Sequence, residues 1–113
     1  MSAGIYNIKA DQGSTFVFKF TITTNNVPWN LTGYSARMQV RSSVQSSTTI
    51  LNLVSTTNIT LTSLGVITVT VDATTMASIA SGSFVYDLEV QSSSGIVTRL
   101  LQGKFIVSPE VTR

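Results

Sequence analysis

The chain has 113 residues, of which 42% are hydrophobic and only 11% are charged, and its formal net charge is +2. This length corresponds to one domain, and the apolar fraction is too high for a disordered tract. The basic residues are scattered singly, so the chain lacks the basic stripe expected of a nucleic-acid-binding protein. Because it contains neither cysteine nor histidine, disulfides, thiolate metal sites and the commonest general base are excluded.

The N-terminal residues lack a basic segment followed by an apolar one, and no apolar run approaches the about 20 residues of a membrane span. We therefore expect no secretion signal and no contact with a membrane.

The first two strands are expected over residues 5–10 and 15–23, with a turn at residues 11–13 between them. In the first, Tyr6, Ile8 and Ala10 share one face. In the second, every other side chain is large and apolar, and these inward positions are Phe16, Phe18, Phe20 and Ile22. This is the most regular alternation in the chain, and it predicts a central core strand.

The middle of the chain predicts an irregular crossover around Pro28 and then four more strands. These strands are expected over residues 34–41, 50–54, 58–62 and 66–71. The outer face of the first is basic because it carries Arg37 and Arg41, and a polar loop follows it. Gly65 lies in the expected hairpin turn between the last two strands.

Residues 72–82 break the alternation and predict one or two helical turns near residues 73–80. Asp72 or Thr74 is suited to cap the helix, and Met76 and Ile79 are three residues apart, as on one face of a helix. We expect this segment to be a crossover at one end of the fold.

The last hairpin is expected over residues 82–107, with its turn at residues 92–95. One face of its first strand is apolar and consists of Phe84, Tyr86, Leu88 and Val90. Gly103 is expected to mark a bulge in the return strand, because a residue without a Cβ packs nothing there. Pro109 is expected to end that strand.

About eight short strands and one helical fragment predict an all-β fold: an antiparallel, two-sheet, immunoglobulin-like β-sandwich in a single domain over residues 1–113. A small closed barrel is the alternative. Residues 1–6 and 109–113 are expected to be extended arms, available for strand addition to neighbouring chains.

With no histidine and no cysteine, enzyme chemistry would need carboxylates. Asp87 and Glu89 are expected on one strand face about 7 Å apart, a separation that would suit a glycosidase pair. We interpret them instead as solvated charges that pair with Arg37 or Arg41 on a neighbouring strand. We therefore expect no catalytic site, no metal site, no cofactor and no enzymatic activity.

Two aromatic residues, Trp29 and Tyr86, are candidates for a role beyond core packing. Trp29, the only tryptophan, either plugs the end of the core or forms a platform for a sugar or a protein partner. Tyr86 follows the helical crossover at the position of the tyrosine corner in immunoglobulin-like sandwiches, so its hydroxyl is expected to bond back to the crossover backbone. Leu88 would then stand where antibody domains have their second disulfide cysteine.

Together these patterns give two sets of candidate residues. The structural set, expected to hold the core, is Phe16, Phe18, Phe20, Tyr86 and Leu88. The candidate interface set, in the expected arms and the crossover, is Tyr6, Ile8, Trp29 and Val111.

Three segments together resemble small bacteriophage virion proteins. They are Asp11-Gln12-Gly13 before the Phe-rich strand, Asn30-Leu-Thr-Gly-Tyr-Ser-Ala-Arg-Met-Gln-Val-Arg41, and Tyr86-Asp-Leu-Glu-Val with Thr98-Arg-Leu-Leu in the return strand. Over nearly the whole chain, the sequence resembles the immunoglobulin-like N-terminal domain of baseplate upper proteins in tailed phages. The long helical or fibrous extension that follows this domain in those proteins is not part of the sequence.

The resemblance implies a structural component of the virion, located in the tail or baseplate or acting as a fibre adaptor. It implies contacts with other phage virion proteins, and a homo-oligomer or several copies in a symmetric assembly that forms in the host cytoplasm. Two alternatives stay open: a capsid decoration protein, and a glycan-binding or adhesive module in which Trp29 and Tyr34 form a sugar platform.

Overall fold

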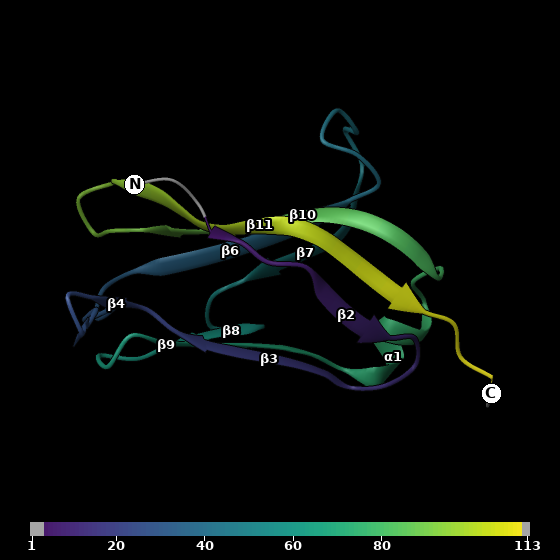
Figure 1. The fold of residues 1–113 in the computed structure, drawn as a ribbon, viewed down its shortest axis with the longest axis horizontal. Helices are drawn as coiled ribbons and strands as arrows, with labels where there is room; N and C mark the ends of the chain where they lie inside the picture. Colours follow the sequence, from purple (N-terminus) through teal and green to yellow (C-terminus); the bar gives the residue numbers. More distant parts are fainter. Residues whose placement is uncertain (1–3, 112–113) are drawn as a thin grey trace.

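The computed structural model describes residues 4–111 as two β-sheets that face each other, with a short helix at one end (Figure 1). The elements in chain order are β1 (Gly4–Ile5), β2 (Ile8–Asp11), β3 (Phe16–Thr21), β4 (Thr23–Thr24), β5 (Val27–Pro28), β6 (Ser35–Arg41), β7 (Thr49–Val54), β8 (Ile59–Leu61), β9 (Val66–Val71), α1 (Ala73–Ala77), β10 (Gly82–Gln91) and β11 (Val97–Ser108). This confirms the predicted all-β sandwich.

The larger sheet, here sheet A, has the strand order β1-β11-β10-β6-β7, with β2 also paired to β11. Sheet B has the order β3-β9-β8, and β4 and β5 form a separate hairpin. Most pairs are antiparallel, whereas β1 and β2 both run parallel to β11. Within residues 4–111, no helix is long and apolar enough to cross a membrane.

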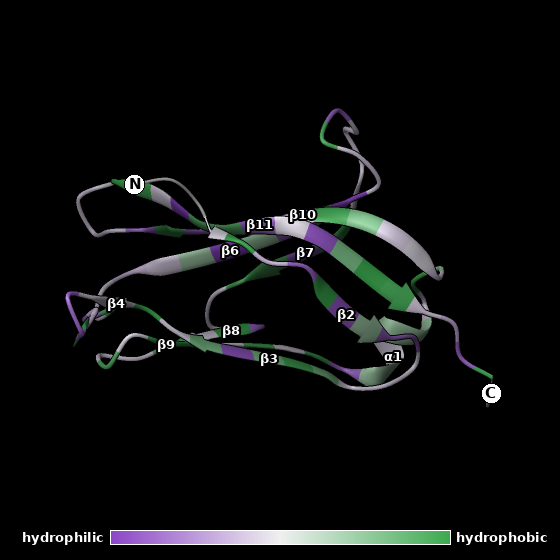
Figure 2. Ribbon diagram, in the orientation of Figure 1, coloured by the Kyte–Doolittle hydropathy of each residue, from purple (hydrophilic) through white to green (hydrophobic). Residues whose placement is uncertain are grey.

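Alternating side chains determine which face of each strand is buried. In β9, Ile67, Val69 and Val71 are buried and the residues between them are less so, and the same alternation runs along β10. Figure 2 shows this alternation as successive bands of apolar and polar residues along β3 and β11. The period-2 pattern of the sequence therefore defines the inner face of both sheets.

The strand with the phenylalanines, β3, lies at an edge of sheet B, so the prediction of a central strand is wrong. Its pairing partner is β9, and β9 in turn lies between β3 and β8. Phe16 is buried, whereas Phe18 and Phe20 are partly buried and pack against the core. Alternation reports that one face is covered, but it carries no information on how many neighbours a strand has.

The segment predicted as one strand over residues 5–10 is divided into β1 and β2. Ile8 and Ala10 are buried as expected, but Tyr6 is 51% exposed and lies between the two strands. Gly4 and Ile5 pair with Leu101 and Gln102 of β11, so the described part of the expected N-terminal arm belongs to the sheet. Residues 1–3 lie outside the described residues.

Gly103 marks the place where the N-terminal segment approaches β11, and it is not a bulge. It pairs in regular register with Tyr86, and the shift in register between β10 and β11 lies between Leu88 and Glu89. A Cβ on Gly103 would lie 2.4 Å from the carbonyl oxygen of Tyr6, closer than such atoms can come. Glycine is therefore required by this contact.

The hydroxyl of Tyr86 bonds back to a different segment from the one predicted. It donates a hydrogen bond of 2.6 Å to the carbonyl oxygen of Tyr6 and not to the backbone of residues 72–82. Beside it, the backbone N–H of Lys104 donates to Asn7 Oδ1 at 3.1 Å. These two bonds hold the interruption between β1 and β2 against the sheet.

The helical crossover forms where the sequence predicts it. Asp72 is the N-cap of α1, and its carboxylate accepts a hydrogen bond of 2.8 Å from the backbone N–H of Thr75. Hydrogen bonds from the side chain and from the backbone of Thr75 lower the pKa of Asp72. Met76 and Ile79 point inward and close this end of the core.

One side chain, Gln12, joins three segments beside α1. Its Nε2 donates to the carbonyl oxygen of Ile79 at 2.7 Å, and its Oε1 accepts from the backbone N–H of Glu110 at 3.0 Å. Its own backbone N–H donates to the carbonyl oxygen of Ser108 at 2.9 Å. Pro109 follows the end of β11 as expected, and the first part of the expected C-terminal arm is thus attached to the domain; residues 112–113 lie outside the described residues.

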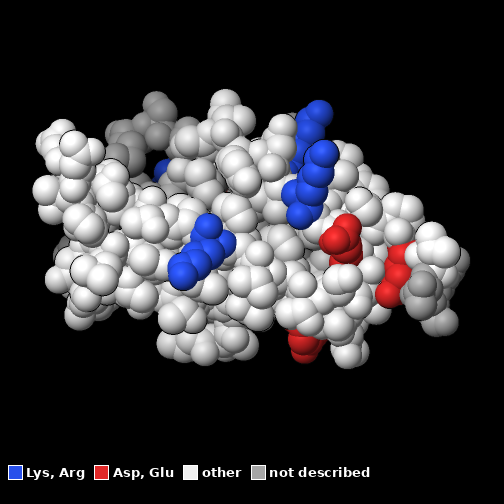
Figure 3. Space-filling view, turned by 60° about the horizontal axis from the view of Figure 1, so that its bottom comes forward, with Lys and Arg blue, Asp and Glu red and all other residues white. Residues whose placement is uncertain are grey.

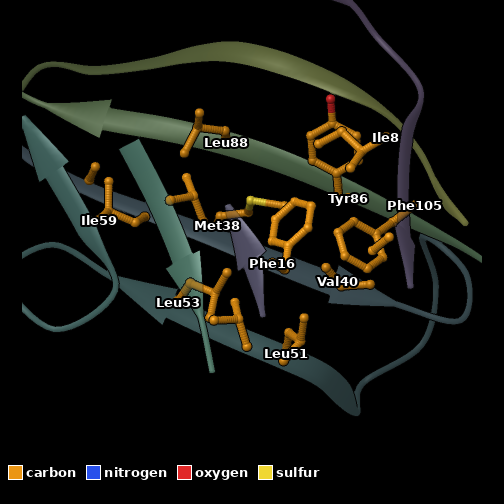
Figure 4. Packing of buried hydrophobic residues seen from close by; sticks show 14 of the residues in the cluster. Ile8, Phe16, Met38, Val40, Leu51, Leu53, Ile59, Tyr86, Leu88 and Phe105 are labelled. Atoms are coloured by element: carbon orange, nitrogen blue, oxygen red, sulfur yellow. The ribbon is translucent and has the colours of Figure 1, made fainter. Parts of the chain in front are cut away.

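The core lies between the two sheets and is entirely apolar among the described residues (Figure 4). Phe105 of sheet A is fully buried, and its ring centroid lies 5.5 Å from that of Phe16 of sheet B, edge to face. Leu88 and Tyr86 are also buried. Stability therefore depends on apolar packing across the two layers.

Candidate protein-binding surface

The outer face of sheet A carries an ordered pattern of polar side chains on β6, β10 and β11. The strand pairing places them in three rows across the sheet, each centred on β10. The rows are Arg37-Glu89-Arg99, Gln39-Asp87-Gln102 and Arg41-Val85-Lys104. Neighbouring strands lie about 4.8 Å apart, so the side chains of one row are in direct reach of one another.

In the first two rows the carboxylates are neutralised by arginines. Arg37 Nε lies 2.9 Å from Glu89 Oε1, one of the pairings predicted from the sequence. Asp87 Oδ2 lies 3.5 Å from Arg99 Nε, so its partner comes from β11 and not from β6. The interpretation of Asp87 and Glu89 as paired surface charges is therefore confirmed, with Arg99 as a partner that the sequence did not reveal.

Asp87 is the less favourably placed of the two carboxylates. Partial burial on the sheet and the neighbouring charge of Glu89 raise its pKa, and Arg99, Arg37 and Arg41 oppose this effect only in part. The ionised carboxylate of Asp87 is thus less stable in the folded protein than in water.

The second and third rows, with Arg99, line a hollow of about 440 Å³ on this face, so that Arg41, Arg99 and Lys104 share it with one carboxylate, that of Asp87. Val85 lies in the hollow between Arg41 and Lys104, while Val44 and Ile5 contribute apolar surface. Val44 belongs to the loop between β6 and β7, which stands above the sheet in Figure 1. The hollow therefore combines positive charge with exposed apolar surface.

The outer face of sheet B is different, because hydroxyl and methyl groups dominate it. Its outward residues on β3, β8 and β9 are Val17, Lys19, Thr21, Thr60, Val66, Thr68 and Thr70. Lys19 is the only charged residue on these three strands. Figure 3, which brings this side forward, shows one basic group surrounded by uncharged surface left of the centre, with further basic and acidic groups to its right.

The four residues proposed from the sequence as an interface set are not brought together into one patch. Ile8 is 3% exposed and belongs to the core, so it offers no surface to a partner. Val111 is 91% exposed beyond the end of β11, and Tyr6 is half-exposed against sheet A. Trp29 is partly buried, its indole N–H donates to Thr24 Oγ1, and its ring packs near Tyr34, 6.4 Å between centroids.

The residues of the hollow were missed as a group by sequence reasoning. Each of them looked like an ordinary outward residue, and only the strand register brings Arg41, Val85 and Lys104 into one row. Alternation did place Val85 and Arg41 on the outside of their strands. Alternation could have revealed the hollow only if the pairing of β6, β10 and β11 had been known.

The described residues offer no metal site, since among residues 4–111 no three His, Cys, Asp or Glu side chains come together. The two carboxylates that could have formed a glycosidase pair each lie beside an arginine. The surface is thus suited to protein contacts through charge pairs and apolar area.

Comparison with known proteins addresses the identity of the domain. The model of the BppU N-terminal domain family matches residues 2–108, nearly the whole chain. The chain belongs to this family. BppU is the baseplate upper protein of phages, so the family assignment identifies a structural domain of the phage baseplate and confirms the predicted resemblance.

No curated protein matches the sequence. Among solved structures, the fold is similar to that of CopC from Methylosinus trichosporium OB3b, with a TM-score of 0.49 and 16% identity over 94% of this chain and 89% of that one. A BppU N-terminal domain is a component of the virion and interacts with other virion proteins. Its candidate site is therefore a docking surface, and the two outer sheet faces are the candidates for it.

Proposed function

We propose that this chain is a structural adaptor in the tail or baseplate of a tailed phage, and that it connects neighbouring virion proteins through the outer faces of its two sheets. The match of the BppU N-terminal domain family over residues 2–108 is the observation that carries the proposal. The proposed adaptor works through contact alone and is not an enzyme. It is present in several copies, as the symmetry of a phage tail requires.

The arrangement of the surface supports this proposal. The charged rows on sheet A and the threonine-rich face of sheet B are chemically distinct, so one domain can contact two different neighbours. The buried core depends on no bound group, because all its described members are apolar side chains of the two sheets.

The test is to locate the chain in purified particles of the phage that encodes it. Particles carrying a tagged copy are imaged by cryo-electron microscopy after labelling of the tag. Label at the distal end of the tail is expected. Label over the head would contradict the proposal and favour a capsid decoration protein, and particles without the chain would contradict any role in the virion.

The glycan-binding alternative has no comparable support. Its platform would need an open aromatic face, whereas Trp29 is partly buried against the core and its N–H is engaged by Thr24. We therefore retain the adaptor as the proposed function.

A further inference from the structure

The row Arg41-Val85-Lys104 differs from the other two rows on the outer face of sheet A. In those rows the central residue on β10 is a carboxylate, Glu89 or Asp87, which lies beside an arginine. In this row the centre is Val85, so two positive charges flank an apolar residue with no carboxylate between them. The central position on β10 thus carries a carboxylate in two rows and an uncharged side chain in the third.

The two cations of this row are held in different ways. The guanidinium of Arg41 donates to the carbonyl oxygen of Ser46 at 2.6 Å and to Gln39 Oε1 at 2.8 Å, so it is fixed at the rim of the hollow. Lys104 is exposed and forms no ion pair with any residue between 4 and 111. Both positive charges are thus available to an acidic group that enters from outside.

Apolar side chains line the hollow together with these charges. Val44 is 78% exposed and Ile5 is 79% exposed, and both line the same hollow of about 440 Å³. Such a volume holds a few side chains, and an aliphatic side chain that covered Val44 and Ile5 would remove exposed apolar area from water. A ligand that complements this hollow therefore has a carboxylate next to an apolar side chain.

The chain has few carboxylates of its own to offer. Asp87 and Glu89 lie beside arginines, and Asp72 caps α1. The carboxyl group of Glu110 lies directly against Gly13. Because this leaves only Asp11 of the five acidic residues, the complementary acid is better supplied by a different protein than by a second copy.

Building on the proposed adaptor function, we propose that the hollow around Val85 is the docking site for a segment of another virion protein that presents an Asp or Glu side chain beside an apolar one. The carboxylate lies between Arg41 and Lys104, and the apolar side chain covers Val44 and Ile5. The cations that line the hollow, Arg41, Arg99 and Lys104, outnumber its one carboxylate, Asp87, so an acidic group is favoured beside Val85, whereas on the other two rows it would lie directly against Asp87 or Glu89.

The first experiment reverses the charge of the hollow in assembled particles. A phage that lacks the gene is complemented with the unaltered chain, with Lys104→Glu, or with Thr74→Glu as the control on α1, outside both sheet faces. Both residues are exposed, and equal thermal unfolding midpoints of the purified variants show that both still fold. We expect Lys104→Glu to reduce the copies per particle, measured by quantitative mass spectrometry, by about tenfold or more, and Thr74→Glu to leave them unchanged.

The outcomes separate the two proposals. If the unaltered chain is absent from particles, the proposed function itself fails. If it is present and Lys104→Glu enters particles as well as Thr74→Glu does, the function stands and the docking site is overturned.

The second experiment identifies what occupies the hollow. A photoreactive benzoylphenylalanine replaces Val44, or the exposed Leu64 in the turn between β8 and β9 as the control, and particles are irradiated before mass spectrometry. We expect a cross-link from residue 44 to a peptide of another virion protein that contains Asp or Glu next to an apolar residue. A cross-link from residue 44 to another copy of this chain, or no cross-link from it in particles that contain the chain, overturns the proposal.

Discussion

The outer faces of the two sheets use the same scaffold with opposite chemistry. Six charged residues lie on β6, β10 and β11 of sheet A, whereas β3, β8 and β9 of sheet B carry Lys19 alone. Ordered charges discriminate between partners, because a wrong neighbour brings like charges together. Threonine hydroxyls and valine methyl groups provide contact area but little discrimination. For the proposed adaptor, the difference assigns the selection of a neighbour to sheet A and nonspecific contact area to sheet B.

Removal of the support shared by both faces has the largest expected effect. Phe105→Ala leaves a cavity where sheet A meets Phe16 of sheet B, so we expect the free energy of unfolding to fall by about 3–5 kcal/mol. Urea denaturation measures this change. Val17→Ala, on the outer face of sheet B, is the control and should shift it by no more than about 0.5 kcal/mol. Equal effects of the two changes would show that the sheets do not depend on this contact.

A change at Gly103 should affect sheet A without affecting sheet B. The new Cβ of Gly103→Ala would lie 2.4 Å from the Tyr6 carbonyl oxygen, so the N-terminal segment must move away at a cost of more than about 1 kcal/mol. Hydrogen exchange should then speed up in β1 and β2 and stay unchanged in β9. Gly95→Ala is the control for backbone strain, because its φ of +93° also disfavours alanine while nothing lies within 4 Å of the added Cβ, so exchange in β1 and β2 should stay as in the parent. Faster exchange in β9 would contradict the separation of the two sheets.

The hydroxyl of Tyr86 contributes a smaller part of the same attachment. Tyr86→Phe removes the hydrogen bond to the Tyr6 carbonyl and should cost about 0.5–1.5 kcal/mol at pH 7. Burial, with a lesser effect of Tyr6, raises the pKa of Tyr86 from 10.0 to about 12. Since the folded state favours the neutral hydroxyl, this stability is present below pH 10 and is lost as the pH rises towards 12. The urea midpoint of the parent should therefore fall between pH 8 and pH 11 by more than that of Tyr86→Phe. An equal fall in both proteins would contradict this assignment.

The smallest effects are expected from the two carboxylates of sheet A, and they should have opposite signs. Glu89→Gln removes the ion pair with Arg37 and should destabilise the fold by about 0.2–1 kcal/mol. Asp87→Asn should be neutral or slightly stabilising at pH 7, because the folded state disfavours the charge of Asp87 and raises its pKa. This advantage should disappear near pH 3, where Asp87 is protonated in both states. Urea denaturation at pH 7 and pH 3 measures the change in the free energy of unfolding. A loss of stability in Asp87→Asn at pH 7 would contradict the expected direction of this change.

The inner faces of the sheets could be predicted from the sequence, because alternation alone determines them. Residues 66–71 and 82–91 show this, and the helix after Asp72 could be predicted because its segment breaks the alternation and begins with a capping residue. Features that depend on contacts between distant segments could not be predicted. The edge position of β3, the approach of Tyr6 to Gly103 and the row through Val85 all depend on strand pairing, which a period-2 pattern does not encode.

The junction at Gln12 has a mechanical consequence. The chain leaves the sandwich at Glu110, whose backbone N–H is bonded to Gln12, and Gln12 in turn holds Ile79 and Ser108. Tension applied at Val111 is therefore divided among the turn before β3, the end of the helical crossover and the last residue of β11. The side chain and the backbone N–H of one residue thus distribute load over three stretches of backbone before any strand begins to separate.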